Sequence, residues 1–377
     1  MSIFSRLSRG LATLVPVVSI LAGFVMAQSE GSQIQPKYLA LPPAHPVNIP
    51  EYQVAGLGLK TWTGSFTYLG TKYNYTMIGT DPSKGSATTT VKFVLIPLAV
   101  KFPGGVVLDP TKPLQSGCGT GTALGLTRNS PILKNVTWNQ GGTNVGTTQY
   151  VDAFQRAEFW SSVSKSSPNY HVLMGTPIIE PKQTLDASSS GTVSSGSCGV
   201  YGSLDINTFD AAVQSIISSL NLQANEFPYF VTYDVFQSQG GQCCVLGYHS
   251  ITNSNIVYGT GSYNDQAIFA GPPNAFLDIV TMSHEIGETV NDPFVQNANA
   301  TPSWVSPYAP QYGCNNFLEV GDPLAGYPEP AKVPGNPHQY YVQDLAFETW
   351  FAKATTSTSV NGWYSMYGVF LTPAPGC

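Results

Sequence analysis

The segment from Thr61 to Phe102 constrains the fold most strongly, because it consists of β-prone runs separated by turn sequences. The runs TWTGSFTYLG, KYNYTMIG and TTTVKFVLIPLAVKF are rich in Thr, Tyr, Val and Ile, with Gly, Asp-Pro and Lys-Gly sequences between them. Such runs, bounded by turn formers, predict strands and hairpins. The 37 Gly and 29 Pro of the chain favour short strands and many loops elsewhere. An all-helical fold is therefore not expected.

Four segments have the periodicity or the boundaries of helices. Residues 149–163 and 208–220 place apolar side chains at helical spacing on one face. A third helix is expected to begin near Asn274, after two prolines, and to end before Pro293. A last helix is expected over residues 341–353. We predict that these helices pack on a sheet.

Residues 56–377 are predicted to form a single α+β domain with a mixed sheet, several packed helices, many loops and stabilising disulfides. A further pair of strands is expected at 228–236 and 243–251. No linker sequence divides this region. Residues 28–55 are punctuated by prolines and short of periodicity, which predicts an extended N-terminal arm.

Residues 1–27 have the three-part plan of a secretory signal peptide. Arg6 and Arg9 precede an apolar stretch from Leu11 to Met26, and Val25-Met26-Ala27 is the expected cleavage sequence before Gln28. The alternative is a retained membrane anchor, but a spanning helix needs roughly 20 apolar residues and this stretch is shorter. We expect cleavage after Ala27, a secreted or extracytoplasmic location, and no stable membrane insertion afterwards.

The six cysteines all follow the predicted cleavage site, and an even number in an exported protein predicts three disulfides. Cys243 and Cys244 are adjacent. Because a bridge between neighbours needs strained geometry, each of the two is expected to reach a distant partner. The alternative, a catalytic Cys244 served by His249, is disfavoured by the even count and the export signal.

Charged side chains are scarce in this chain. They make up 10% of its residues, against roughly 25% in an average soluble domain, and the net charge is -6. No run of Lys or Arg lies outside the first ten residues, so the electrostatic footprint of nucleic-acid binding is missing. We expect no nucleic-acid partner.

The third predicted helix contains an H-E-x-x-E sequence formed by His284, Glu285 and Glu288. At about 100° per residue, His284 and Glu288 stack one turn apart on the flank of the helix, where they can chelate an ion. Imidazole nitrogen and carboxylate oxygen are both ligands of Zn²⁺. Glu285 projects beside them, where it could take a proton from water. We therefore predict His284 and Glu288 as metal ligands and Glu285 as the catalytic base.

A catalytic zinc usually has three protein ligands, and we expect the third to come from the sequence that follows the helix. Glu319 is the expected third ligand, and Asp322 is expected to hold His284 in one tautomer as an outer hydrogen-bond acceptor. His249 and His338 are the competing third ligands. Because three acids would surround one ion, a harder divalent metal is the alternative to Zn²⁺.

The H-E-x-x-E helix and its downstream acids resemble the zincin metallopeptidases over residues 276–323. This resemblance implies a zincin-like fold and zinc-dependent peptide hydrolysis, with Glu288 standing where that family has its second His. The S-H-E-x-x-E helix, followed by the E-V-G-D sequence that begins at Glu319, is more loosely similar to secreted phosphate-induced, EXORDIUM-like proteins. That second family has growth and cell-surface roles.

Two functional hypotheses of different classes follow from these observations. The first is an exported metal-dependent hydrolase, a monomeric zinc metallopeptidase acting on peptide or cell-wall substrates. The second is a non-enzymatic secreted cell-surface protein that binds polysaccharide, with a structural metal or none. A glycosidase that uses Glu285 and another carboxylate is a third hypothesis, and it requires two acids across a sugar-sized cleft.

Overall fold

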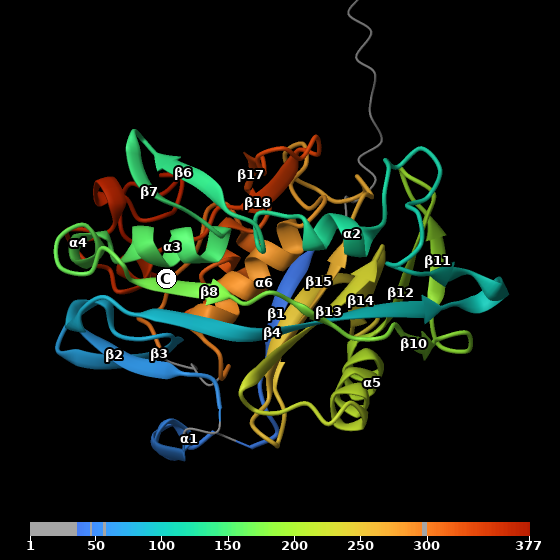
Figure 1. Ribbon diagram of the computed structural model, residues 1–377, viewed down its shortest axis with the longest axis horizontal. Helices are drawn as coiled ribbons and strands as arrows, with labels where there is room; N and C mark the ends of the chain where they lie inside the picture. Colours follow the sequence, from blue (N-terminus) through green and yellow to red (C-terminus); the bar gives the residue numbers. More distant parts are fainter. Residues whose placement is uncertain (1–35, 46, 56–57, 296–299) are drawn as a thin grey trace, which may run out of the picture. The chain divides into compact units, whose positions relative to one another are not determined.

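The centre of the structure is a mixed sheet of twelve strands (Figure 1). The computed structural model describes residues 36–45, 47–55, 58–295 and 300–377. The predicted signal peptide, 1–27, therefore lies outside the described residues. Among the helices that are described, none combines the length and the hydropathy needed to cross a membrane.

Eight strands form the main path of the sheet, and four more attach to its sides. In spatial order the path is β10 (Gln183–Asp186), β4 (Thr88–Lys101), β13 (Glu226–Tyr233), β16 (Val257–Tyr263), β15 (Gln242–Ile251), β14 (Val235–Gln239), β12 (Val200–Asp205) and β11 (Thr192–Ser195). The strands β5 (Val107–Leu108), β8 (His171–Met174) and β9 (Ile178–Ile179) pair with β4, and β1 (Lys37–Leu41) pairs with β15. Parallel pairs such as β4–β13 and antiparallel pairs such as β15–β16 both occur, which confirms the predicted mixed sheet.

Three separate hairpins lie outside the large sheet. They are β2 (Thr61–Tyr68) with β3 (Thr71–Ile78), β6 (Val136–Gln140) with β7 (Thr143–Thr148), and β17 (Pro328–Ala331) with β18 (Tyr340–Gln343). The strands predicted between residues 61 and 102 are thus β2, β3 and β4. The strand predicted at 228–236 is divided into β13 and β14 at Asp234, whose φ of 50° is outside the β region.

Helices cover both faces of the sheet (Figure 1). On one face lie α3 (Tyr150–Glu158) and α6 (Val280–Asn291), and on the other lies α5 (Ile206–Ser219). The alternation of β4 explains the two layers, because successive side chains of a strand point to opposite faces. Phe93 and Leu95 join the core beneath α3 and α6, and Val94 joins the core beneath α5.

The predicted helices at 149–163 and 208–220 are confirmed as α3 with the short α4 (Trp160–Val163) and as α5. The third helix begins later than predicted, at Val280. Asn274 and Asp278 have φ values of 67° and 61°, and the backbone N–H of Asp278 donates to the carbonyl of Asn264 at 2.6 Å. The segment before Val280 is therefore a turn held by a bridge rather than a first helical turn.

The helix predicted over 341–353 is wrong in its first half. Residues 340–343 form β18, which pairs with β17, and only α7 (Glu348–Phe351) is helical in the second half. Tertiary pairing decides this segment, since the alternate residues Tyr340 and Val342 are both fully buried on one side of the ribbon. The described residues also form the α-helices α1 (Ile49–Ala55) and α2 (Ala123–Arg128) and several short 3-10 helices.

All six cysteines form disulfides, as predicted, but the pairing corrects one expectation. Cys243 bonds to its neighbour Cys244, and neither reaches a distant partner. The fold brings Cys118 to Cys198, with Cα atoms 5.4 Å apart, and Cys314 to Cys377, with Cα atoms 5.9 Å apart. These Cα separations are within the usual range for a disulfide. Because the other four cysteines are bonded to one another, Cys243 and Cys244 have no other thiol to pair with.

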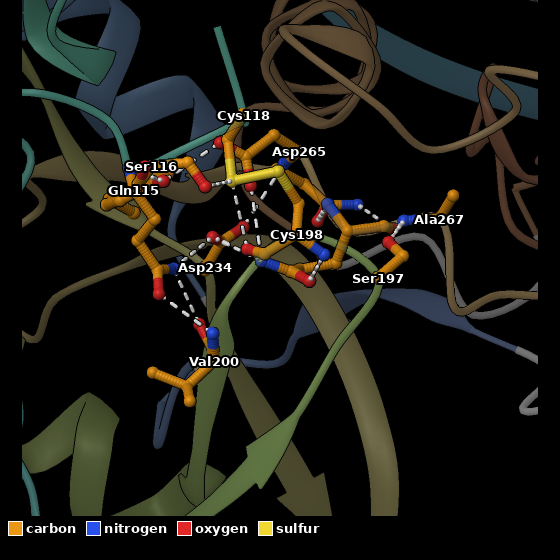
Figure 2. The surroundings of a disulfide bond; sticks show 12 residues. Gln115, Ser116, Cys118, Ser197, Cys198, Val200, Asp234, Asp265 and Ala267 are labelled. Atoms are coloured by element: carbon orange, nitrogen blue, oxygen red, sulfur yellow. Dashed lines mark hydrogen bonds between the residues drawn. A yellow bond between two sulfur atoms is a disulfide. The ribbon is translucent and has the colours of Figure 1, made fainter.

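The Cys118–Cys198 bridge is tied to the sheet by Gln115 (Figure 2). The side-chain amide of Gln115 donates to the carbonyl of Val200 at 2.7 Å and to Asp234 at 3.1 Å, and it accepts from the Val200 N–H at 2.8 Å. Disulfides persist in oxidising compartments, so the three bridges are typical of an extracytoplasmic protein.

Candidate metal centre

Helix α6 and strand β15 bring two histidines and several acids together in the interior. Helix α6 carries His284, Glu285 and Glu288, and β15 carries His249. The loop that follows Leu318 adds Glu319 and Asp322. All of these side chains are buried, with exposed fractions between 0 and 6%.

Two glycines allow these elements to approach so closely. A Cβ atom on Gly247 of β15 would lie 2.6 Å from the Thr281 side chain and 2.9 Å from the Glu285 side chain. A Cβ atom on Gly321 would lie 2.4 Å from His284 Nδ1. Any larger residue would push the helix or the loop away from the cluster.

His284 is oriented by a glutamine that sequence reasoning missed. Gln343 Nε2 donates to the carbonyl of Gly321 at 2.6 Å, so its Oε1 faces His284 Nδ1 at 3.0 Å. Because Oε1 can only accept, the imidazole hydrogen lies on Nδ1 and Nε2 carries the lone pair. His284 Nε2 lies 3.0 Å from Glu288 Oε1 and 3.7 Å from Asp322 Oδ1. The nitrogen available to a metal thus faces two carboxylates.

Glu288 is placed between the two histidines. Its Oε1 accepts the backbone N–H groups of Gly321 at 3.1 Å and Asp322 at 3.2 Å, and its Oε2 lies 3.7 Å from His249 Nδ1. Burial raises the pKa of this carboxyl, but His284, His249 and the Gly321 N–H outweigh burial and leave the pKa below its ordinary value. The two backbone N–H groups that its Oε1 accepts favour the ionised form of Glu288.

His249 forms the second half of the cluster. Its Nδ1 lies 3.3 Å from Glu285 Oε2, and its Nε2 lies 3.7 Å from Glu319 Oε2. Burial lowers the pKa of His249 to about 4, so the ring is neutral at pH 7. Each of its two nitrogens faces a carboxylate, although a neutral ring has only one hydrogen to donate.

The other acids of the cluster carry raised pKa values. Burial is the largest cause for Glu285, Glu319 and Asp322, and the negative charge of Glu288 is the next. A weaker attraction from Lys37 acts on Asp322 in the opposite sense. The raised pKa values mean that burial and the charge of Glu288 disfavour the ionised form of each acid, and a bound cation would favour that form again.

The donor set fits a divalent cation. His284, Glu288 and Asp322 offer ligand atoms that lie within 4.8 Å of one another, and so do His249, Glu285 and Glu288. Among the described residues, His284 Nε2, Glu285 Oε1 and Asp322 Oδ1 are buried without a hydrogen-bond partner. Buried polar atoms are normally satisfied, and a cation bound between His284 and Asp322 would satisfy the first and the third of these atoms.

The structure separates the residues that the sequence grouped around one ion. Asp322 was expected to accept a hydrogen bond from His284 as an outer residue, but it lies near Nε2, the same ring nitrogen that faces Glu288. Glu319, the expected third ligand, lies nearer to His249 than the sequence could show. His338, one of the competing ligands, pairs with Asp278 at 3.4 Å in a different part of the fold.

Strand β1 covers the cluster. The ring of Tyr38 stacks on the His284 ring with centroids 3.7 Å apart and an interplanar angle of 25°, and Tyr38 is fully buried. The Tyr38 N–H donates to Tyr312 Oη at 2.8 Å. No sequence signal identifies Tyr38, because its contact with α6 spans most of the chain. The predicted arm thus supplies a strand of the sheet and the cover of the centre (Figure 1).

Comparison of the chain with protein-family models, with curated proteins and with solved structures finds no match. The resemblance to zincins therefore rests on the H-E-x-x-E motif, and a zincin fold is not established. The buried cluster of His and Glu side chains is the property on which a function can be argued.

Proposed function

We propose that this protein is an exported metal-dependent hydrolase whose cation is bound by His284, Glu288 and Asp322. The orientation of His284 carries the proposal, because Gln343 occupies Nδ1 and the Nε2 lone pair is directed at two buried carboxylates. A lone pair and two carboxylates repel one another unless positive charge lies between them. Zn²⁺ is the ion we propose, and Mn²⁺ is the alternative that an oxygen-rich donor set favours.

A divalent cation held by His284, Glu288 and Asp322 would supply Lewis-acid chemistry, activating water and a substrate carbonyl. The contribution of the chain itself is Glu285, whose Oε1 has no hydrogen-bond partner in the described part of the molecule. Its other oxygen, Oε2, lies 3.3 Å from His249 Nδ1, a contact that holds the side chain in place. Glu285 Oε1 accepts the proton of the attacking water and returns it to the leaving group. Peptides are the proposed substrate class.

The test is the Glu285→Gln variant, which keeps the size of the side chain and removes the base. The rate should fall by roughly 10²- to 10⁴-fold, the usual share of general-base catalysis, while the ion bound by His284 is retained. The assay uses a peptide library and cell-wall polysaccharides, with metal content measured on the same samples. His338→Ala is the control, because it removes a histidine outside the cluster. Equal cleavage by wild type and Glu285→Gln would refute the hydrolase.

A second candidate is a non-enzymatic cell-surface protein with a structural metal. The burial of the whole cluster, with Tyr38 stacked on His284, favours this candidate because substrate must displace the cover to reach the ion. In that case chelation should lower the melting temperature, no substrate should be cleaved, and Glu285→Gln should leave polysaccharide binding unchanged.

A further inference from the structure

We propose that the centre holds two divalent cations, which share Glu288 as a bridging ligand. The first is the cation bound by His284, Glu288 and Asp322. The second is bound by His249 Nδ1, Glu285 Oε2 and Glu288 Oε2. This inference rests on the metal centre proposed above, but it does not depend on hydrolysis.

The two oxygens of Glu288 face different histidines. Oε1 lies 3.0 Å from His284 Nε2, whereas Oε2 lies 3.7 Å from His249 Nδ1. Each oxygen belongs to a set of three converging donors, and Glu288 is the one residue that both sets share. A carboxylate that uses one oxygen for each ion is a bridge, and ions in two-metal sites are about 3.5–4 Å apart.

The second position has a histidine of its own, His249 of β15, with a carboxylate on the side of each ring nitrogen. Glu285 Oε2 lies on the Nδ1 side of His249, and Glu319 Oε2 lies 3.7 Å away on the Nε2 side. A carboxylate that takes the hydrogen of one imidazole nitrogen leaves the lone pair on the other, which is how outer acids orient metal-binding histidines. At 3.7 Å this contact is longer than a hydrogen bond, and both atoms are buried without a hydrogen-bond partner among the described residues. Binding of the second ion at Nδ1 therefore moves the ring hydrogen to Nε2, where Glu319 is the nearest acceptor. Glu285 binds the second ion through Oε2, so its Oε1 remains free to accept the proton of the attacking water.

Charge supports two ions rather than one. Four buried carboxylates meet here, and their ion-pair contacts within the described residues are to the two histidines. A fifth buried acid, Asp292, interacts with Glu319 and raises its pKa, so it adds to the negative charge. One divalent cation would leave two of the four negative charges uncompensated when all are ionised, and uncompensated buried charge is strongly destabilising. Two divalent cations would neutralise all four. The four carboxylates are those of Glu285, Glu288, Glu319 and Asp322.

Metal stoichiometry tests the proposal on the full mature chain. Metal-free protein is dialysed against Zn²⁺, and bound zinc is counted by elemental analysis. Wild type should bind two ions per chain, His249→Ala one, His284→Ala one, and Glu288→Ala none with high affinity. The control His338→Ala should bind two. Thermal unfolding of each variant identifies any loss of metal that follows from loss of fold.

A second measurement needs no variant. Wild type is loaded with two equivalents of Mn²⁺ or of Co²⁺, and its electron paramagnetic resonance spectrum is recorded. A shared carboxylate should give an exchange-coupled pair, whereas separate ions give the spectrum of isolated centres. One ion per chain that is lost in His284→Ala and kept in His249→Ala would refute the second position and leave the proposed function intact. Two uncoupled ions would refute the bridge, and no bound ion would refute the metal centre itself.

Discussion

Gln343 offers a sensitive test of the proposed metal centre, because it contacts His284 and the Gly321 loop without being a ligand itself. Its Oε1 faces His284 Nδ1 at 3.0 Å, and its Nε2 donates to the Gly321 carbonyl at 2.6 Å. Gln343→Leu keeps a similar volume and removes both hydrogen bonds. The imidazole then loses the contact that fixes its tautomer and its ring orientation, so Nε2 is no longer held toward Glu288.

The expected loss of metal affinity is about 10- to 100-fold, the usual cost of removing a group that orients a metal-binding histidine. Stability should fall as well, because His284 Nδ1 and the Gly321 carbonyl are left buried and unpaired at roughly 1–3 kcal/mol each. Gln343→Glu is the matched variant. Its carboxylate still accepts from Nδ1, so metal affinity should be retained even though the hydrogen bond to Gly321 is lost.

Affinity is measured by competition with a chromophoric chelator, and stability by urea unfolding of the metal-free protein. The two readouts separate an effect on the ion from an effect on the fold. If Gln343→Leu binds zinc as tightly as wild type, His284 is not oriented by Gln343 and the assignment of its lone pair to Nε2 is wrong. If Gln343→Glu loses as much affinity as Gln343→Leu, the effect comes from the Gly321 loop instead.

Three further predictions follow from the structure. Tyr38→Ala removes the ring that covers His284, so release of zinc to a chelator should become faster; an unchanged release rate would show that β1 does not cover the centre. Burial raises the pKa of Glu348 from 4.5 to about 7. The folded state therefore favours the protonated carboxyl, and the free energy of unfolding should fall by roughly 3 kcal/mol as the pH rises from about 4.5 to 7. Glu348→Gln should make the urea stability profile less steep over that range, while Asp344, whose pKa burial also raises to about 7, keeps part of the slope. A profile as steep as that of wild type would contradict the assignment. Replacing Cys118 and Cys198 with Ser opens a loop of 80 residues and should cost up to about 4 kcal/mol in urea unfolding, whereas unchanged stability would exclude a stabilising role.

Local patterns in the sequence were sufficient to identify much of the secondary structure. The strands β2, β3 and β4 follow from β-prone runs and turn residues, and α3 and α5 follow from apolar residues at helical spacing. The pairing of His284 with Glu288 is equally local, since residues four apart on a helix lie side by side. The even number of cysteines also predicted complete pairing, because that inference needs only the composition and the compartment.

The tertiary structure decided the features that depend on distant segments. The approach of His249 to Glu285 is set by the packing of α6 on β15, and a local pattern holds no information about it. The same is true of the stacking of Tyr38 on His284 and of the contact between Gln343 and His284.

Competition between local preference and long-range pairing explains the errors. A helix was expected from residue 341, but residues 340–343 form β18, because β17 supplies the hydrogen bonds that a strand needs. Cys243 and Cys244 bond to each other because the fold assigns the other four cysteines to two distant pairs. The sequence therefore determined which residues can bind a metal, whereas the packing of α6, β15 and the loop after Leu318 decided which of them meet. The physical reason is that ligand geometry depends on distances between segments, and those distances are set only when the core is packed.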